Sequence, residues 1–155
     1  IPWNQDKEAY AIYSNFIIEM MQSMNITYNN ILDIGCGLGF FSQRLKKFGK
    51  VTGIDISITA VQKAKESFTD VNFFAVDIKN KNLSFVKEYY KKFELIILKE
   101  IIWYILPEIN QVIDNISSLL HDRSYLIISQ FFPPLDIAFY GKDKIPTPEA
   151  LFNLL

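Results

Sequence analysis

Apolar residues occur along the chain in short, nearly continuous runs that end in polar or glycine-rich segments. Runs of this length, rich in Ile, Val and Phe, are typical of strands that are buried on both faces of a sheet. They predict five strands, at residues 31–34, 50–57, 71–78, 93–101 and 124–132. Pro133 and Pro134 stop the last strand, since proline has no N–H for a strand ladder.

A second pattern, with apolar residues three and four positions apart, predicts helices between the strands. Ser57 is a good N-cap for a helix over 58–68, and residues 109–120 form a helix with one buried stripe. Residues 80–92 are ambiguous. In residues 6–24 the pattern places these apolar side chains on one stripe: Ala9, Tyr13, Phe16, Ile17, Met20, Met21 and Met24.

The alternation of strands and helices predicts the fold class. Five strands with helices between them indicate a parallel sheet covered on both faces, so we expect an α/β, doubly wound fold with right-handed crossovers. At 155 residues the chain is expected to be one domain, with an N-terminal helical cap over 1–28, a cofactor-binding core over 29–132 and a truncated C-terminal segment over 133–155. In such sheets, ligands bind at the carboxyl ends of the strands.

Composition and charge exclude several classes of protein. The 16 Lys and Arg against 17 Asp and Glu leave a net charge of -1, so nucleic acid is not an expected partner. One cysteine cannot form an internal disulfide, and neither a secretory leader pattern nor about 18 consecutive apolar residues occurs, so we expect a cytoplasmic protein with no membrane partner. Nothing clusters His and Cys at metal-ligand spacing, so no metal is expected. The chain begins without Met and ends in a helical pattern, from which we expect a fragment.

The densest motif is "ILDIGCGLGF" at 31–40, where three glycines follow a strand and precede a helix. A dinucleotide site uses G-x-G-x-x-G, but here Gly39 comes one residue early and Phe40 stands where the last glycine belongs. Asp33, two residues before Gly35, would repel a phosphate in a partly desolvated site. A P-loop is excluded because no Gly-Lys-Ser/Thr follows the glycines. We therefore expect a ligand without phosphate.

Three aspartates, Asp33, Asp55 and Asp77, each fall near the carboxyl end of one of the first three strands. Because these ends meet at one edge of a parallel sheet, we expect the carboxylates to gather there. Taken alone, each aspartate could be a helix cap or a solvated strand end, and the glycine loop could be a plain turn. Together they favour a ligand site.

The segments "DIGCGLG", "GIDIS", "AVDI" and "FELIILKEIIWYI" resemble the class I S-adenosylmethionine-dependent methyltransferases, and the similarity covers most of residues 31–132. The resemblance implies a Rossmann-like sheet with the strand order 3-2-1-4-5. It also implies S-adenosylmethionine as the cofactor and S-adenosylhomocysteine as the product. The sheet of this family normally gains two further strands, the last one antiparallel, and we expect strands 6 and 7 to be missing from this chain.

The resemblance assigns the glycine loop to the methionine and ribose portions of the cofactor. Gly35, Gly37 and Gly39 would let the backbone pass beneath them, with Cys36 as a small residue between two glycines. Asp33 would act on the ammonium side, directly or through water.

The same resemblance assigns the other two acids to the nucleoside. Asp55 would accept hydrogen bonds from both ribose hydroxyls, and Ile56 would pack against the adenine face. Asp77 would accept from the exocyclic amine of adenine, and Ile78 would close the other side of the ring.

The end of the fourth strand supplies the remaining candidates. The backbone carbonyls of Leu98 and Lys99 would face the methionine amino group, and Glu100 and Tyr104 are the candidate catalytic residues. They lie where this family often reads E-V-L-x-H, and Tyr104 replaces the histidine, so a histidine base is not expected. A similar E-V-L-Y-Y variant occurs in members that resemble the nodulation N-methyltransferases, which act on an amino sugar.

We therefore expect a methyltransferase that acts on nitrogen or oxygen of a small-molecule acceptor. A protein acceptor, a catalytically silent cofactor-binding module and a nucleotide-dependent oxidoreductase are the alternatives. The sequence leaves the identity of the acceptor and the oligomeric state open.

Overall fold

The computed structural model describes residues 8–81 and 83–155, and residues 1–7 of the predicted N-terminal cap lie outside these ranges. The described chain forms one parallel sheet in the order β3-β2-β1-β4-β5. This arrangement confirms the predicted fold class and strand order. The strands are β1 (Tyr28–Ile34), β2 (Gly49–Asp55), β3 (Asn72–Ala75), β4 (Phe93–Lys99) and β5 (Leu120–Ser129).

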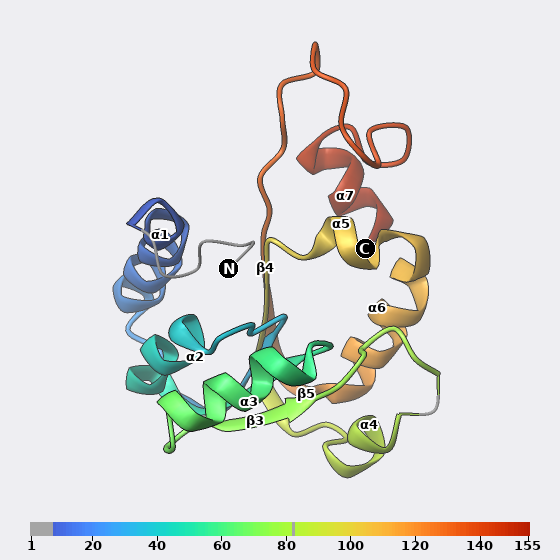
Figure 1. Ribbon diagram of the computed structural model, residues 1–155. Coiled ribbons are helices and arrows are strands. Elements are labelled where there is room, and N and C mark those ends of the chain that lie inside the picture. Colours follow the sequence, from blue (N-terminus) through green and yellow to red (C-terminus); the bar gives the residue numbers. More distant parts are fainter. Residues whose placement is uncertain (1–7, 82) are drawn as a thin grey trace.

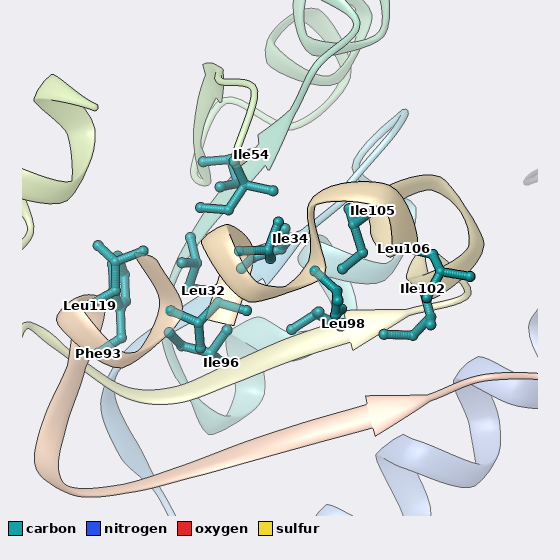
Figure 2. Packing of buried hydrophobic residues seen from close by; sticks show 14 of the residues in the cluster. Leu32, Ile34, Ile54, Phe93, Ile96, Leu98, Ile102, Ile105, Leu106 and Leu119 are labelled. Atoms are coloured by element: carbon teal, nitrogen blue, oxygen red, sulfur yellow. The ribbon is translucent and has the colours of Figure 1, made fainter. Parts of the chain in front are cut away.

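Side chains along the central strands alternate between two buried faces. Leu32 on β1 and Ile96 on β4 belong to the cluster drawn in Figure 2, called here the Leu32 cluster. Their neighbours Ile31 and Leu95 belong to a second cluster on the opposite face, the Ile31 cluster. Because both faces of the strands are covered, successive residues are all apolar, which explains the continuous runs in the sequence.

Helices cover the two faces of the sheet (Figure 1). The Ile31 cluster includes side chains from α1 (Glu8–Met24), α2 (Phe40–Leu45) and α3 (Ile58–Ser67). The Leu32 cluster includes side chains from α4 (Ser84–Glu88), α5 (Ile102–Ile105), α6 (Ile109–Leu119) and α7 (Pro148–Leu154). Ser57 caps α3 as predicted, since its Oγ accepts from the amide of Ala60 at 3.2 Å.

The buried face of α1 differs from the predicted stripe. Residues 14, 17, 18 and 21 are buried, at the spacing i, i+3, i+4 and i+7, and the first of them is a serine. Tyr13, Phe16 and Met24, predicted to be on the buried stripe, are exposed. The helix is apolar on most of its circumference, so its periodicity alone allowed more than one choice of buried face.

The bounds of all five strands differ from the predicted ranges, most of all those of β3 and β5. β3 ends at Ala75 rather than at residue 78, so Asp77 lies in the loop beyond the strand. β5 begins at Leu120 and ends at residue 129, whereas the prediction was 124–132. The register between β4 and β5 is irregular near the start of both strands. The polar residues 121–124 lie in this part of β5, so the search for apolar runs placed the start of the strand too late.

The segment after β5 loops out and returns to pack beside α5 (Figure 1). Thr147 caps α7 by accepting from the amide of Ala150 at 3.3 Å. Ile145 and Leu151 are both buried in the Leu32 cluster. These contacts tie the C-terminal segment to the helices that carry one wall of the site described next.

Candidate functional site

A cavity of about 940 Å³ opens at the carboxyl ends of β1, β2 and β4 and beside the loop that follows β3. This volume is at the upper end of the range for small-molecule sites, which is about 300–1,000 Å³. The residues that line it and were predicted to bind the cofactor or to act in catalysis are Gly35, Gly37, Asp55, Ile56, Asp77, Ile78, Lys99, Glu100 and Tyr104.

The backbone amides of the glycine loop are bonded within the chain. The amides of Gly35 and Cys36 both donate to the Ile54 carbonyl, at 2.8 and 3.0 Å. The amide of Gly37 donates to Oδ2 of Asp55 at 2.8 Å, and that of Gly39 donates to the Cys36 carbonyl at 3.0 Å. In phosphate-binding loops, backbone N–H groups are free to donate to the ligand. In this loop the four amides named above donate instead to protein carbonyls and to the Asp55 carboxylate.

Glycine is required at two positions of this loop by both conformation and space. Gly35 and Gly39 have φ values of +79° and +83°. A Cβ at Gly35 would lie 2.5 Å from Ile101 Cγ2, and one at Gly39 would lie 2.6 Å from the Phe73 ring. Any residue larger than glycine is therefore excluded at positions 35 and 39 by neighbouring protein atoms.

Asp55 is the last residue of β2, and its carboxylate is fixed in place by two backbone amides. Oδ1 accepts from Ser57 and Oδ2 accepts from Gly37, both at 2.8 Å. Each carboxylate oxygen has a second lone pair, so the group still has capacity for two further donors. A carboxylate held in this way at a cavity wall suits a ligand that carries two neighbouring hydroxyl groups.

Asp77 and Ile78 lie in the loop after β3, on the same side of the cavity as Asp55. Oδ1 of Asp77 accepts from the amide of Lys79 at 3.1 Å, which closes a local turn. Ile78 is buried in the Leu32 cluster and also contributes to the cavity wall. The ends of β2 and β3 thus bring Asp55 and Asp77 to one cavity, whereas the third carboxylate of the prediction, Asp33, does not line it.

Asn115 on α6 supports this loop, and the sequence analysis missed it. Its side chain is buried, and Nδ2 donates to the carbonyls of Ile78 and Asn80 at 2.8 and 3.0 Å. A signal was present in the sequence, because Asn115 falls on the same stripe as Val112 and Leu119, which is otherwise apolar. A polar residue at such a position usually has a specific hydrogen-bond partner.

Glu100 follows β4 in a left-handed backbone conformation, with φ of +58°. Its Oε2 accepts from the amide of Phe131 at 3.1 Å and from Nε2 of Gln130 at 3.2 Å. Gln130 in turn accepts from the amide of Ile102, the first residue of α5, at 3.0 Å. Burial raises the pKa of Glu100. Non-glycine residues with positive φ are strained and gather at functional sites.

Aromatic side chains form the wall of the cavity next to Glu100. Trp103 and Tyr104 on α5 and Phe131 after β5 all line the cavity. Trp103 packs edge-on against Phe132 and Phe139, with ring centroids 5.4 Å apart in both pairs. The cavity therefore has one half with carboxylates and polar backbone, and another half that is aromatic.

Asp33 is buried and does not line the cavity, and its predicted role on the ammonium side, directly or through water, stays a prediction. It is 2% exposed, and Ser42 Oγ donates to its Oδ2 at 2.5 Å. Burial raises the pKa of Asp33 to about 6, against the opposing effects of Ser42 and of the Lys99 charge. Burial also lowers the pKa of Lys99 to about 8, and its Nζ lies 5.3 Å from the centre of the Phe41 ring.

Three other predicted residues are buried behind the wall with Asp33, namely Cys36, Gly39 and Leu98. Burial raises the pKa of the Cys36 thiol, so it stays protonated at neutral pH. Within residues 8–81 and 83–155, no three His, Cys, Asp or Glu side chains gather where they could hold a metal ion. In the same ranges, no helix is long and apolar enough to cross a membrane.

Comparison with known protein families adds independent information. A family model described as a methyltransferase domain matches residues 28–140. Putative methyltransferase 235L of Invertebrate iridescent virus 6 is 32% identical over 91 residues, which cover 57% of this chain and 31% of that protein. Ubiquinone biosynthesis O-methyltransferase of Coxiella burnetii is 25% identical over 135 residues, which cover 86% of this chain and 56% of that protein.

Comparison with solved structures supports the fold. The N-methyltransferase NodS from Bradyrhizobium japonicum WM9, in complex with S-adenosyl-L-homocysteine, superimposes with a TM-score of 0.67 at 22% sequence identity. The match covers 82% of this chain and 65% of NodS. The chain spans less than two thirds of the length of NodS and of the two relatives named above.

Proposed function

The chain belongs to the family of methyltransferase domains that matches its residues 28–140, and from this premise we propose that it transfers a methyl group from S-adenosylmethionine to a small-molecule acceptor. The relatives named as O-methyltransferases and the neighbour named as an N-methyltransferase support acceptors with oxygen or nitrogen nucleophiles.

The observation that carries the proposal is the hydrogen bond between the Gly37 amide and the Asp55 carboxylate. This bond places the negative charge of the Asp55 carboxylate against the glycine loop. It also occupies the Gly37 amide, which a bound pyrophosphate would need as a donor. A pyrophosphate at the loop would have to compete with this carboxylate for the Gly37 amide, whereas a cationic ligand with a ribose diol would find acceptors. S-adenosylmethionine carries a sulfonium, an ammonium and a diol, and no phosphate, so these residues fit it.

The cofactor is proposed to lie along the first four strand ends. Asp55 accepts from the ribose hydroxyls through its two remaining lone pairs, and Ile56 packs on adenine. Asp77 accepts from the adenine amine, with Ile78 on the other face of the ring.

The methionine end is proposed to lie over Gly35 and Gly37 and towards Lys99, whose backbone carbonyl receives the amino group. Asp33 is buried near this region, where Ser42 Oγ donates to its carboxylate and the Lys99 charge partly opposes the rise in its pKa that burial causes.

When bound, S-adenosylmethionine would supply its sulfonium methyl group for in-line transfer to an acceptor nitrogen or oxygen, with S-adenosylhomocysteine as the leaving group. The chain's contribution is mainly alignment, which can supply up to about 7–11 kcal/mol of the barrier reduction. The aromatic half of the cavity, with Trp103, Tyr104 and Phe131, holds the acceptor and excludes water. Glu100 is the proposed proton acceptor for an oxygen nucleophile, since this residue lines the cavity and burial raises its pKa, which makes its carboxylate a stronger base.

Calorimetric titration and a transfer assay test the proposal. S-adenosylhomocysteine should bind with micromolar affinity and NAD should give no heat of binding. Incubation with S-adenosylmethionine labelled in its methyl group should move label into a pool of small metabolites, with boiled protein as the control.

Each alternative has a distinct outcome. Binding of NAD in place of S-adenosylhomocysteine would refute the proposal in favour of an oxidoreductase. Binding of S-adenosylhomocysteine without label transfer to metabolites or to added protein would indicate a silent module. Label found only in protein would replace the small-molecule acceptor by a protein one.

A further inference from the structure

The loop after β3 carries Asp77 and Ile78, but local bonds alone do not fix its place in the molecule. The amide of Asn80 donates to the carbonyl of Asp77 at 3.2 Å, and the amide of Lys79 donates to Oδ1 of Asp77 at 3.1 Å. Both bonds close the turn upon itself. The Val76 amide also donates to the Asp55 carbonyl at 2.9 Å and the Ile78 side chain is buried in the Leu32 cluster, so the start of the loop is held. Its backbone from Ile78 to Asn80 needs a further contact if Asp77 is to keep its place relative to Asp55.

Asn115 provides that contact from α6. Its Nδ2 uses both N–H groups on this loop, one on the Ile78 carbonyl at 2.8 Å and one on the Asn80 carbonyl at 3.0 Å. Its Oδ1 accepts from Nε2 of Gln111 at 3.3 Å. The Asn115 side-chain amide is thus oriented by one donor, Gln111, and by two acceptors, the loop carbonyls. Asn115 is 6% exposed.

The helix that carries Asn115 is itself firmly held. Val112, Ile116 and Leu119 on the same face are 0%, 3% and 0% exposed and pack in the Leu32 cluster. A buried amide in such a stripe is unfavourable unless it is fully bonded, and an apolar side chain would leave two loop carbonyls without these donors.

From these contacts we infer that Asn115 is a positioning residue for adenine recognition. It acts through the loop, by fixing the carbonyls of Ile78 and Asn80 and hence the place of the Asp77 carboxylate relative to Asp55. The inference rests on the proposed function, because it requires adenine to occupy this half of the cavity. It adds a residue outside the cavity wall that determines the choice of base.

Ligand discrimination separates this role from a merely structural one. The probes are S-adenosylhomocysteine and its analogue in which hydrogen replaces the 6-amino group, both titrated by calorimetry. Asn115→Asp keeps the size of the side chain but turns a donor into an acceptor that faces two carbonyls. Asn115→Ser is a milder second variant, in case the first does not fold, and circular dichroism checks both.

Two control variants come from the same helix. Asn110→Asp makes the same chemical change at an exposed position, and Ile116→Val removes a buried methyl group without touching a hydrogen bond. Both should keep the wild-type preference between the two probes.

We expect the wild type to favour S-adenosylhomocysteine by about tenfold or more, as for a hydrogen bond to a charged acceptor. In the Asn115 variants this preference should fall to about threefold or less, mainly through weaker binding of S-adenosylhomocysteine. A preserved preference in a folded Asn115 variant, or an equal loss in Ile116→Val, would overturn the inference and leave the proposed function standing. Failure of the wild type to bind S-adenosylhomocysteine would overturn both.

Discussion

Replacement of Asp55 by alanine tests the proposed cofactor site most directly. The carboxylate stands at the end of β2, where each of its oxygens already accepts one backbone amide at 2.8 Å. The two lone pairs that remain are the ones proposed to receive the ribose hydroxyls. Asp55→Ala therefore removes both acceptors at once and also frees the amide of Gly37 beneath the ligand.

The expected magnitude follows from the charge of the acceptor. Hydrogen bonds to an ionised group are worth about 1.5–3 kcal/mol, which corresponds to a loss of affinity for S-adenosylhomocysteine of roughly 10- to 150-fold. The freed Gly37 amide adds to the cost because it must find water or remain unpaired. Stability should change less, because both amides lie in partly buried or exposed surroundings.

Calorimetry on a pair of ligands distinguishes a lost contact from a general disturbance of the site. In the wild type, removal of the ribose 2′-hydroxyl from S-adenosylhomocysteine should weaken binding about tenfold or more, since one hydrogen bond to a charged acceptor is lost. In Asp55→Ala the same change to the ligand should have little effect, because the acceptor is already gone. Asp114→Ala, at an exposed position on α6, is the matched control and should bind both ligands as the wild type does.

An equal loss on removal of the 2′-hydroxyl in the wild type and in Asp55→Ala would refute the ribose assignment. An unchanged affinity for S-adenosylhomocysteine in Asp55→Ala would refute it more directly. Either result would require a different orientation of the ligand, with the carboxylate acting only as a partner of the Gly37 and Ser57 amides.

Three further substitutions test the surroundings of the site. Burial raises the pKa of Asp33 from 3.8 to about 6, so the folded chain binds a proton on this carboxyl group more tightly than the unfolded chain does. The free energy of unfolding should therefore fall by about 3 kcal/mol as pH rises from about 4 to about 6. Urea unfolding across that range should show this slope in the wild type and lose it in Asp33→Asn; a slope that persists would contradict the assignment. Ser42→Ala removes the hydrogen bond that lowers the pKa of Asp33, so the upper end of the sloping range should extend to higher pH, with a loss of about 1–3 kcal/mol at pH 7. An unchanged upper end would count against this assignment. Gly53→Ala would bring a Cβ to 2.6 Å from the Phe73 ring and should lower the free energy of unfolding by about 1–3 kcal/mol, whereas an unchanged thermal midpoint would mean that this ring is not packed on β2 as described.

The fold could be predicted from the sequence because its pattern is repetitive. Residues such as Ile31 and Leu32 are buried on opposite faces of one sheet, and only a strand covered on both faces allows such a run. Element boundaries were less predictable where polar residues continue a strand, as at the start of β5. The face of α1 was unpredictable for the opposite reason, because too much of its circumference is apolar.

The candidate site could be predicted as far as strand ends determine it. Asp55 and Asp77 reach the cavity because parallel topology brings the ends of β2 and β3 together. Asn115 and Gln130 could not be assigned in this way, because their partners lie about 28 to 37 residues away and on other elements. Such bonds depend on how a helix or a strand end docks, which local spacing does not specify.

The repulsion of phosphate, which the sequence analysis assigned to Asp33, fits Asp55 better in the structure. The sequence assigned the repulsion of phosphate to Asp33, because it stands beside the first glycine. In the structure that carboxylate is buried under the loop with a raised pKa and a lysine near it, so its charge is largely compensated. Asp55, 18 residues beyond Gly37, is the carboxylate that meets a loop amide at the cavity wall. Under the proposed function, selection against phosphate and binding of the ribose both depend on the Asp55 side chain, so we expect the two properties to change together when Asp55 is replaced.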